Sequence, residues 1–363
     1  MNHRQLLRDV LGGHRLTEEE AITLFSARDR IFFDILSAAD DLRESRAGSV
    51  VTYVRNQNLH ITNICKNLCG FCGFGRRVDD EGAFFDSPDD IRKKARLAAS
   101  RKVTEICLLS GVHPDFTIKS YKDILEWVRE AAPGVHIHAF SPDEVQHAAT
   151  QSGISTREVL EEMRSSGLGS LQGTAAEILV DEVRSVICPR KVDTDTWIRI
   201  IREAHEMGIL TTATIMYGSY EGISERVRHL SILRDIQDQT GGFSEMIPLT
   251  YIHTGTRLFQ QGIATPGATG REDLLMIALS RLYLDNFRNI QVSWGKLGIK
   301  MSQMALLSGA NDLAGTMFSD DVSADAGAAG AEYLDPTVME RIVRDIGRTL
   351  SQRYTDYSLV SSR

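Results

Sequence analysis

The sequence lacks long apolar runs, and this bounds where the protein can reside. No stretch of its 363 residues approaches the roughly 18 uninterrupted apolar residues that a membrane-spanning helix requires. The N-terminal stretch MNHRQLLRDVLGG turns polar quickly and has neither the apolar core nor the cleavage site of a signal peptide. We therefore expect a cytoplasmic protein without a membrane partner.

Positive charge is also in short supply. Lys and Arg number 41 against 49 Asp and Glu, which gives a formal net charge of −8. A protein that binds nucleic acid needs a basic stripe to neutralise phosphates. The acidic balance therefore favours no nucleic-acid partner, while an apolar fraction of 42% is typical of a globular protein.

Cysteines are few, five in all, and their number is odd. Three of them, Cys65, Cys69 and Cys72, fall within one short segment. In a reducing compartment such crowding indicates metal ligation rather than disulfides. Cys107 and Cys188 lie apart in apolar or proline-flanked settings, and we interpret them as structural residues.

The sequence contains no internal repeat of roughly 20–50 residues, which excludes solenoids and propellers. After Gly48, short β-branched runs alternate with longer amphipathic segments. We predict strands at 58–62, 104–109, 135–140, 168–172, 210–216, 244–249, 290–294 and 307–310, and helices at 121–131, 142–151, 195–207, 224–239, 271–288 and 335–351. This alternation predicts an α/β fold, a parallel (β/α)8 TIM-type barrel, with an open doubly wound sheet as the alternative.

Three regions are predicted along the chain. Residues 1–47 form a helical N-terminal extension, in which Thr17 and the glutamates after it begin a helix. Residues 48–319 form the barrel, and residues 320–363 form a C-terminal loop and helix packed on it. Within the last region, 320–332 is rich in small residues and is either a loop across the barrel mouth or a linker to the last helix.

The central motif is the segment 62–74, TNICKNLCGFCGF, a C-x3-C-x2-C spacing directly after a predicted strand. Thiolates are the ligands of iron–sulfur clusters. Three thiolates on a four-iron cubane leave one iron with an open position, which can bind a substrate as the open position of catalytic zinc does. Gly70 and Gly73 let the backbone wrap a bulky cluster, and Phe71 is placed to lay its ring or backbone against an adenine.

Two other interpretations of the cysteines stay open. A zinc site would add His60 to the three thiols, although C-x3-C spacing is unusual for zinc and no second C-x2-C pair is present. A non-catalytic iron–sulfur protein is the other, although an electron carrier has little need for a barrel of this size.

A barrel places its chemistry at the C-terminal ends of its strands. Polar and aromatic residues gather at the predicted ends: Asn63, Ser110, Ser141, Gln172, Tyr217, Tyr251, Trp294 and Asn311. His138 shares a strand face with His136 and lies nearer the mouth, so we expect His138 to contact substrate and His136 to be a core residue. Glu177 follows a strand and either accepts hydrogen bonds from a ribose or favours a helix N-terminus.

At the cysteine loop the chain resembles the radical S-adenosylmethionine superfamily, and the resemblance runs over roughly residues 50–350. Its further markers are HIHAFSPDE at 136–144, GTAAEIL at 173–179, TIMYG at 214–218, DIQDQTGGF at 235–243 and SGANDL at 308–313. Together they resemble the group that makes deazaflavin and menaquinone precursors. Within it the chain is most similar to the tyrosine-using subunits of FO synthase, because GTAAE stands where menaquinone relatives usually read GGGAE.

The resemblance implies a 4Fe-4S cluster held by Cys65, Cys69 and Cys72, whose open iron binds the methionine end of S-adenosyl-L-methionine. In that family one electron, from a donor such as ferredoxin or flavodoxin, cleaves the sulfonium to a 5′-deoxyadenosyl radical. The radical takes hydrogen from L-tyrosine, the Cα–Cβ bond breaks, and the 4-hydroxybenzyl fragment joins 5-amino-6-(D-ribitylamino)uracil. The product then feeds the second FO synthase subunit, a further expected partner.

Candidate site residues come from their position in the cysteine loop and at the predicted strand ends, and the resemblance adds Ser110 and Gly111. The alternative for Ser110 and Gly111 is a plain strand–loop turn, and for the aromatic residues it is core packing. We expect Phe71, Ser110, Gly111 and Glu177 to contact the cosubstrate. We expect His138, Tyr217 and Tyr251 to act in catalysis, with Trp294 and His253 as further candidates. A menaquinone-pathway enzyme acting on a futalosine-type nucleoside is the alternative within the group.

The sequence departs from the family pattern in three places. Leu109-Ser110-Gly111 stands where relatives usually have Gln-Gly-Gly, although the Ser110 hydroxyl and the backbone can still donate. Gly73-Phe74-Gly75 replaces a common Ala-Phe, and the segment 326–330 lacks a histidine found near its end in relatives. These departures indicate a diverged paralogue with another substrate as an alternative.

Overall fold

The computed structural model describes residues 2–174, 176–328 and 332–361. Ala175, in the GTAAE phrase, and Ala329 and Gly330, in the segment that lacks the histidine, lie outside the described residues. Within the described ranges no helix is long and apolar enough to cross a membrane.

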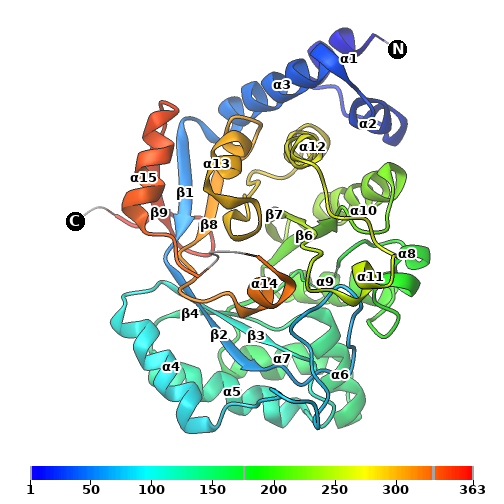
Figure 1. The fold of residues 1–363 in the computed structure, drawn as a ribbon. Helices are drawn as coiled ribbons and strands as arrows, with labels where there is room; N and C mark the ends of the chain where they lie inside the picture. The colour runs from blue at the N-terminus through cyan, green and yellow to red at the C-terminus, as the bar shows by residue number, and fades with distance from the viewer. Residues whose placement is uncertain (1, 175, 329–331, 362–363) are drawn as a thin grey trace.

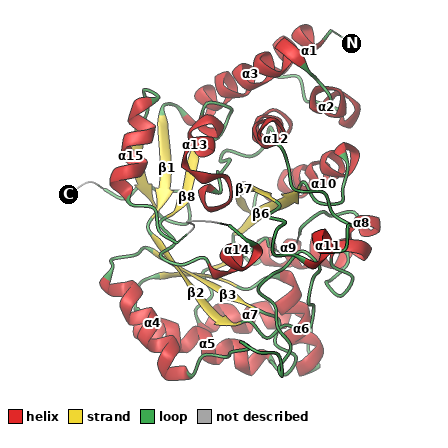
Figure 2. Cartoon of the chain, in the orientation of Figure 1, coloured by secondary structure: helices red, strands yellow, loops and turns green. Residues whose placement is uncertain are grey.

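Parallel strands form the centre of the molecule (Figures 1 and 2). In chain order they are β1 (Val50–Val54), β2 (Asn56–Thr62), β3 (Glu105–Ser110), β4 (His136–Ala139), β5 (Ser170–Leu171), β6 (Thr211–Tyr217), β7 (Phe243–Thr250), β8 (Asp312–Gly315) and β9 (Thr349–Arg353). β2 to β7 lie side by side in chain order, and β8, β1 and β9 form a second sheet.

Backbone bridges join the two sheets into a closed barrel. Met246 in β7 pairs with Ile290, and Gln291 pairs with Asp312 in β8, so the segment 290–291 stands between those strands. β8 pairs with β1, and beyond it the Asn58 N–H donates to the Met317 carbonyl at 2.8 Å, which returns the sheet to β2. Six strands, the 290–291 segment and β8 make eight positions, which confirms the predicted (β/α)8 barrel.

Helices surround the barrel and extend it (Figure 1). The outer helices are α4 (Pro88–Ser100), α5 (Ile118–Ala131), α6 (Pro142–Ser152), α7 (Thr156–Ser166), α9 (Thr194–Glu206), α10 (Ile223–Thr240), α12 (Gly270–Tyr283), α13 (Trp294–Leu306) and α15 (Pro336–Asp345). The N-terminal stretch forms α1 (His3–Leu11), α2 (Glu18–Phe25) and α3 (Asp29–Ala47), and shorter helices are α8 (Asp181–Ile187), α11 (Arg257–Gln260) and α14 (Asp321–Ala326). α2 and α3 pack on α10 and α12, outside the barrel.

Local sequence signals set many helix ends. Thr17 and Glu20 form the predicted capping box at the start of α2. Ser87 accepts a hydrogen bond from the Asp90 N–H at 3.2 Å and starts α4. Gly153 and Gly241 adopt the left-handed conformation that closes α6 and α10.

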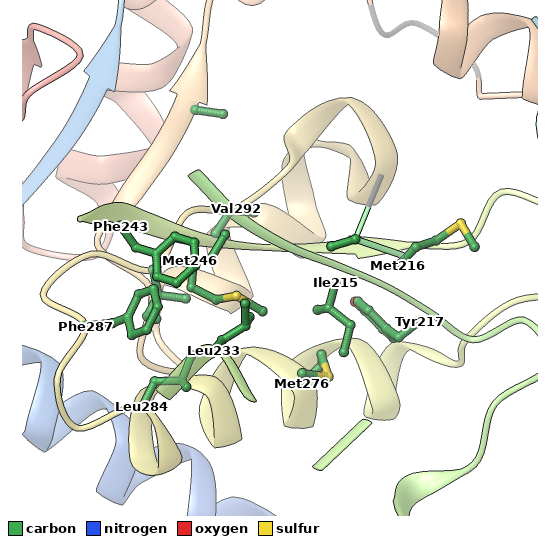
Figure 3. Close-up of a cluster of buried hydrophobic side chains, with 14 of the residues drawn as sticks. Ile215, Met216, Tyr217, Leu233, Phe243, Met246, Met276, Leu284, Phe287 and Val292 are labelled. Carbon is green, nitrogen blue, oxygen red and sulfur yellow. The ribbon is translucent and has the colours of Figure 1, made fainter. Parts of the chain in front are cut away.

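The wall of the barrel at β6 and β7 packs apolar side chains against the outer helices (Figure 3). The rings of Phe243 and Phe287 stack with centroids 5.5 Å apart at 23°, an offset arrangement that aromatic quadrupoles favour. Met216 and Tyr217 lie on opposite sides of β6 in the same view, as successive strand residues must. β6 therefore presents Met216 to the barrel interior and Tyr217 to the helices.

Two predictions of secondary structure were wrong, and one strand was not predicted. The predicted strand at 307–310 is the turn after α13, and the strand follows at β8 (Asp312–Gly315), whose four residues include Asp, Ala and Gly and carry little strand signal. The predicted helix at 335–351 ends at Asp345, because Gly347 adopts a φ of 74°, and the chain continues as β9. β1 had no prediction, and its pairing with β9 is a long-range contact that sequence periodicity does not reveal.

The C-terminal strand closes the N-terminal end of the barrel with a buried charge cluster. Arg353 in β9 is 1% exposed, and its Nε lies 2.5 Å from Asp312 Oδ2 while its Nη2 lies 3.0 Å from Glu245 Oε2. The Tyr357 hydroxyl also donates to Glu245, and burial raises the pKa of that carboxyl to about 7. A buried charge is tolerated when its partners satisfy it, so these groups depend on one another.

We predict that Arg353→Met lowers the free energy of unfolding by about 3–5 kcal/mol, because it leaves the Asp312 carboxylate buried without its guanidinium. The control is Arg4→Met, which removes an ion pair to Asp34 whose side chains are 60% and 36% exposed and should cost less than about 1 kcal/mol. Urea unfolding of both variants measures the difference. Equal shifts in the two midpoints would contradict the role assigned to Arg353.

Candidate active site

The barrel interior holds two adjoining cavities at and below its C-terminal mouth. The outer cavity has a volume of about 360 Å³ and the inner one about 180 Å³. Residues that line both are Leu109, Gln172, Thr174, Leu249 and Ser293. The two spaces therefore share a boundary made by side chains at the ends of several strands, where a barrel places its chemistry.

The three cysteines of the motif line the outer cavity together. Their loop leaves β2 and is fixed by backbone hydrogen bonds, from the Cys65 N–H to the Arg76 carbonyl at 2.9 Å and from the Lys66 N–H to the Val112 carbonyl at 2.8 Å. The loop also lies against the end of β3, where a Cβ built on Gly111 would meet the Ile64 carbonyl oxygen at 2.5 Å. A glycine is thus required at 111 for the loop to lie this close.

Burial and the neighbouring donor groups act on the pKa of the thiols in opposite directions. All three are free of disulfides. Burial raises the pKa of Cys69 and Cys72, while Lys191 opposes this shift at Cys69 and the N–H groups of Gly75 and Phe74 oppose it at Cys72. A cationic iron cluster would complete the stabilisation of the thiolates, so the donor set and the cavity fit such a group.

The zinc interpretation finds less support in the geometry. His60 is not among the residues that line the outer cavity; its Nδ1 lies 3.1 Å from Asp321 Oδ2, and its ring packs on Phe74 at 5.5 Å. Among the described residues no three His, Cys, Asp or Glu side chains lie close enough to hold one metal ion.

The predicted cosubstrate contacts Phe71, Ser110, Gly111 and Glu177 all line the outer cavity. Two expected donors are already engaged, since the Ser110 hydroxyl donates to the Gly111 carbonyl at 2.8 Å and the Gly111 N–H donates to the Thr62 carbonyl at 2.8 Å. Gly111 therefore serves the site through its lack of a side chain rather than through its N–H.

Glu177 is held by a lysine that sequence analysis did not identify. Lys191 Nζ lies 3.2 Å from Glu177 Oε1 and 3.6 Å from Asp143 Oδ2. Burial alone would lower the pKa of Lys191, but the two carboxylates override it and raise the pKa. Glu177 has a φ of 46°, unusual for a residue with a side chain, and it precedes α8 by several residues rather than standing in its first turn.

Two further ionisable groups of the outer cavity were missed. Lys296 donates to the Ser323 hydroxyl at 3.0 Å and forms no ion pair within the described part of the chain; burial lowers its pKa. Glu144 accepts from the Ser141 N–H at 2.8 Å, and burial raises its pKa to about 8. Its Oε1 has no hydrogen-bond partner among the described residues, so this atom is free to contact a bound molecule. Both positions follow helix starts, where lysine and glutamate are common.

The predicted catalytic residues are divided among different surroundings. His138 lines the inner cavity, where its Nδ1 shares the Ser170 hydroxyl, 2.7 Å away, with His136; burial lowers the pKa of His138 to about 4, so it is neutral. Tyr251 lines the outer cavity and its hydroxyl contacts Thr256. The structure does not bring Tyr217 to either cavity, because its hydroxyl donates to Asp273 in α12 at 2.8 Å on the far side of the strand.

The remaining candidates are also separated. Trp294 lines the inner cavity and donates from Nε1 to the Gly315 carbonyl at 2.8 Å. Asn311 is buried in a structural network, where its Oδ1 accepts from Arg281 at 2.7 Å and from the Ile290 N–H at 2.9 Å. His253 packs edge-to-face on Phe259 and lines neither cavity.

Part of the segment 320–332 covers the mouth as α14. Asp320, Val322, Ser323 and Ala326 line the outer cavity. The helix lies directly on the cysteine loop, since a Cβ on Gly73 would meet the Asp325 carbonyl oxygen at 2.2 Å. Of the two interpretations of this segment, the described residues support the one that crosses the mouth.

Family models match most of the chain. The Radical SAM superfamily model matches residues 59–233, and the CofH/MqnC C-terminal region model matches residues 240–361. The first match contains the second half of β2, the cysteine loop and β3 to β6, and the second contains β7 to β9.

Curated relatives match over nearly the full length. The proteins named 5-amino-6-(D-ribitylamino)uracil–L-tyrosine 4-hydroxyphenyl transferase from Methanoculleus marisnigri and Methanospirillum hungatei are each 58% identical over 98% of this chain and cover 97% and 98% of their own length. The protein of the same name from Methanothermobacter thermautotrophicus is 43% identical over 94% of both chains.

Solved structures match the fold at low identity. Methylornithine synthase (PylB) superposes with a TM-score of 0.73 at 19% identity and covers 97% of this chain and 98% of its own. The FeFe-hydrogenase maturase HydG from Carboxydothermus hydrogenoformans gives 0.77 at 16% identity over 98% of this chain and 80% of its own. These likenesses agree with the closed barrel.

We predict that Cys69→Ala prevents stable cluster assembly, because two thiolates remain where three are needed. Iron and sulfide analysis after anaerobic reconstitution, together with the brown colour of the protein, measures the loss. The control is Cys188→Ala, since Cys188 is buried outside the cavity lining and should leave iron at about four per chain. Full iron content in Cys69→Ala would overturn the ligand assignment.

Proposed function

We propose that this chain couples the 4-hydroxybenzyl group of L-tyrosine to 5-amino-6-(D-ribitylamino)uracil. The chain belongs to the radical SAM superfamily and to the same family as the methanogen 4-hydroxyphenyl transferases. Identity of 58% over 98% of the chain to proteins of that name supports these substrates. In this proposal the reaction is the tyrosine-using step of FO synthesis, on the way to a deazaflavin coenzyme.

Cys65, Cys69 and Cys72 would hold the 4Fe-4S cluster, and the outer cavity beside them would hold S-adenosyl-L-methionine. The radical SAM superfamily implies both groups. When bound, they supply the one-electron chemistry that creates a hydrogen-abstracting carbon radical. The protein's own contribution is to position the reactants and exclude water, and α14 on the cysteine loop serves the second task.

The two cavities differ in the charge of their lining residues, and this difference fits the charges of the proposed reactants. The outer cavity carries Lys191, Lys296, Glu177 and Asp320. The methionine end of the cosubstrate and L-tyrosine are both amino acids with an ammonium and a carboxylate, so they need buried groups of both signs. Lys296, which has no carboxylate partner among the described residues, is the natural anchor for a carboxylate.

The inner cavity offers uncharged hydrogen-bond groups on most of its upper wall, which suits a uracil with a hydroxyl-rich chain. Asn58, His138, Gln172, Thr212, Thr214 and Gln291 line it. His138 is neutral, with a pKa lowered to about 4 by burial, so it offers a donor and an acceptor without a charge. At the bottom the charges of Arg353 and Glu245 satisfy one another. The uracil would then lie below tyrosine, at the boundary made by Gln172 and Thr174.

The proposal includes partners and setting. The electron comes from a ferredoxin or flavodoxin, and the product passes to the second FO synthase subunit, all within the cytoplasm. The departures at Leu109-Ser110-Gly111 are compatible with the same substrates, because Gly111 keeps the close approach of the cysteine loop.

The test is an anaerobic assay of reconstituted protein with dithionite, S-adenosyl-L-methionine, L-tyrosine and the ribitylaminouracil, read by mass spectrometry. We expect 5′-deoxyadenosine and the hydroxybenzyl–uracil adduct to rise together, and the adduct to vanish when either substrate is left out. Tyrosine deuterated at Cβ should carry both deuterons into the adduct, because the Cα–Cβ bond is the one that breaks. Formation of 5′-deoxyadenosine without the adduct would contradict the proposed substrates but would agree with the radical chemistry.

A further inference from the structure

The outer side of the cysteine loop carries a positively charged hollow that the reaction does not use. Its volume is about 260 Å³, and we call it the basic hollow, after Arg77, Arg190 and Arg257. The rest of its lining is Asn67, Leu68, Gly70, Val186, Pro189, Leu258, Gln261 and Ile263. α8 and α11, which lie beside each other in Figure 1, supply part of this lining.

The three arginines are exposed and keep most of their charge free. No carboxylate within the described ranges forms an ion pair with Arg77, Arg190 or Arg257. Arg190 donates to the Lys66 carbonyl at 3.1 Å, and Arg257 donates to the Leu68 carbonyl. A guanidinium has five N–H donors, so each of these two groups retains donors for another acceptor.

The hollow and the outer cavity are separated by one thickness of backbone. Asn67, Leu68 and Gly70 line the basic hollow, while Cys69 between them lines the outer cavity. The Leu258 N–H donates to the Gly70 carbonyl at 3.0 Å, and a Cβ on Gly70 would meet Leu258 Cγ at 2.6 Å, so α11 packs directly on the loop. A molecule seated in the hollow would therefore lie next to a cluster ligand.

The chemistry of the hollow points to a protein rather than a small anion. Among its lining residues Leu258 is buried, Leu68 and Val186 are half-buried, and Ile263 is 42% exposed, while the three arginines are exposed. An apolar centre with an arginine rim is the usual composition of a protein interface. The whole chain carries a net charge of −8, so a strongly acidic partner would be repelled elsewhere and steered to this face.

From these observations we propose that the basic hollow is the docking site of an acidic electron-carrier protein that reduces the cluster through the 67–70 backbone. The inference rests on the proposed function, because it assumes that the cysteines hold a redox cluster. It adds to that function the surface used and the charge of the partner.

Binding tests the site without turnover. The variant is Arg77→Glu combined with Arg190→Glu, and the probe is an acidic ferredoxin titrated against reconstituted protein at low salt. We expect its Kd to rise about tenfold or more, as loss of rim charges predicts. The matched control is Arg341→Glu combined with Arg344→Glu, which changes charge equally on α15, away from α8 and α11 (Figure 1), and should leave the Kd unchanged.

The second part of the test compares reaction rates with two reductants. Ferredoxin-driven deoxyadenosine formation should fall in the hollow variant, while the dithionite-driven rate stays at the wild-type level. Equal ferredoxin affinity in the hollow and α15 variants would overturn the proposal. Displacement of ferredoxin by inorganic phosphate, but not by chloride at matched ionic strength, would also overturn it, because it would indicate a small-anion site. A fall in both rates would also overturn it. If binding behaves as expected but no adduct forms with any reductant, the docking site stands and the proposed substrates fall.

Discussion

The mouth of this barrel depends on one close approach of backbone to backbone. The cysteine loop leaves β2 and lies against the end of β3, where Gly111 has no side chain to hold it away from Ile64. Two more glycines allow close packing on other faces of the loop: α14 packs against Gly73 and α11 packs against Gly70. At Gly111 and Gly73 the neighbouring atom is a main-chain carbonyl oxygen, and at Gly70 it is the Leu258 side chain, so a side chain at any of the three positions would push the cysteine loop away from its neighbour.

From that constraint follows a division of charge along the barrel axis. Ionisable groups of both signs gather beside the thiols, neutral hydrogen-bond groups line much of the inner cavity, and a closed ion cluster around Arg353 seals the far end. At the bottom Arg353 pairs with Asp312 and Glu245, and the Glu105 carboxylate accepts from the Thr355 hydroxyl, whereas Lys296 near the mouth forms no ion pair among the described residues. A reactant that carries charge is thus stabilised near the thiols, and one that is neutral but polar is stabilised deeper in the barrel.

Much of this was available in the sequence, and the parts that were not share a physical reason. The cysteine spacing and the strand–helix alternation are local patterns, and they predicted the barrel and brought Cys65, Cys69, Cys72, Phe71 and Glu177 to one cavity. Tyr217 does not line either cavity, because successive residues of a strand point to opposite faces. Its position at a strand end does not tell which face its side chain takes. Lys191 and Lys296 escaped notice because a single lysine carries no pattern. β9 and the Arg353 cluster depend on pairings across some 300 residues of chain that periodicity does not encode.

The central claim is that three thiolates hold a four-iron cluster with one iron left for the cosubstrate. Mössbauer spectroscopy of iron-labelled, reconstituted protein tests it directly, by comparing spectra before and after S-adenosyl-L-methionine is added. The account predicts that one iron site of the four changes its isomer shift and the other three do not. Spectra that show four unchanged thiolate-bound irons, or that show no cluster at all, would contradict it.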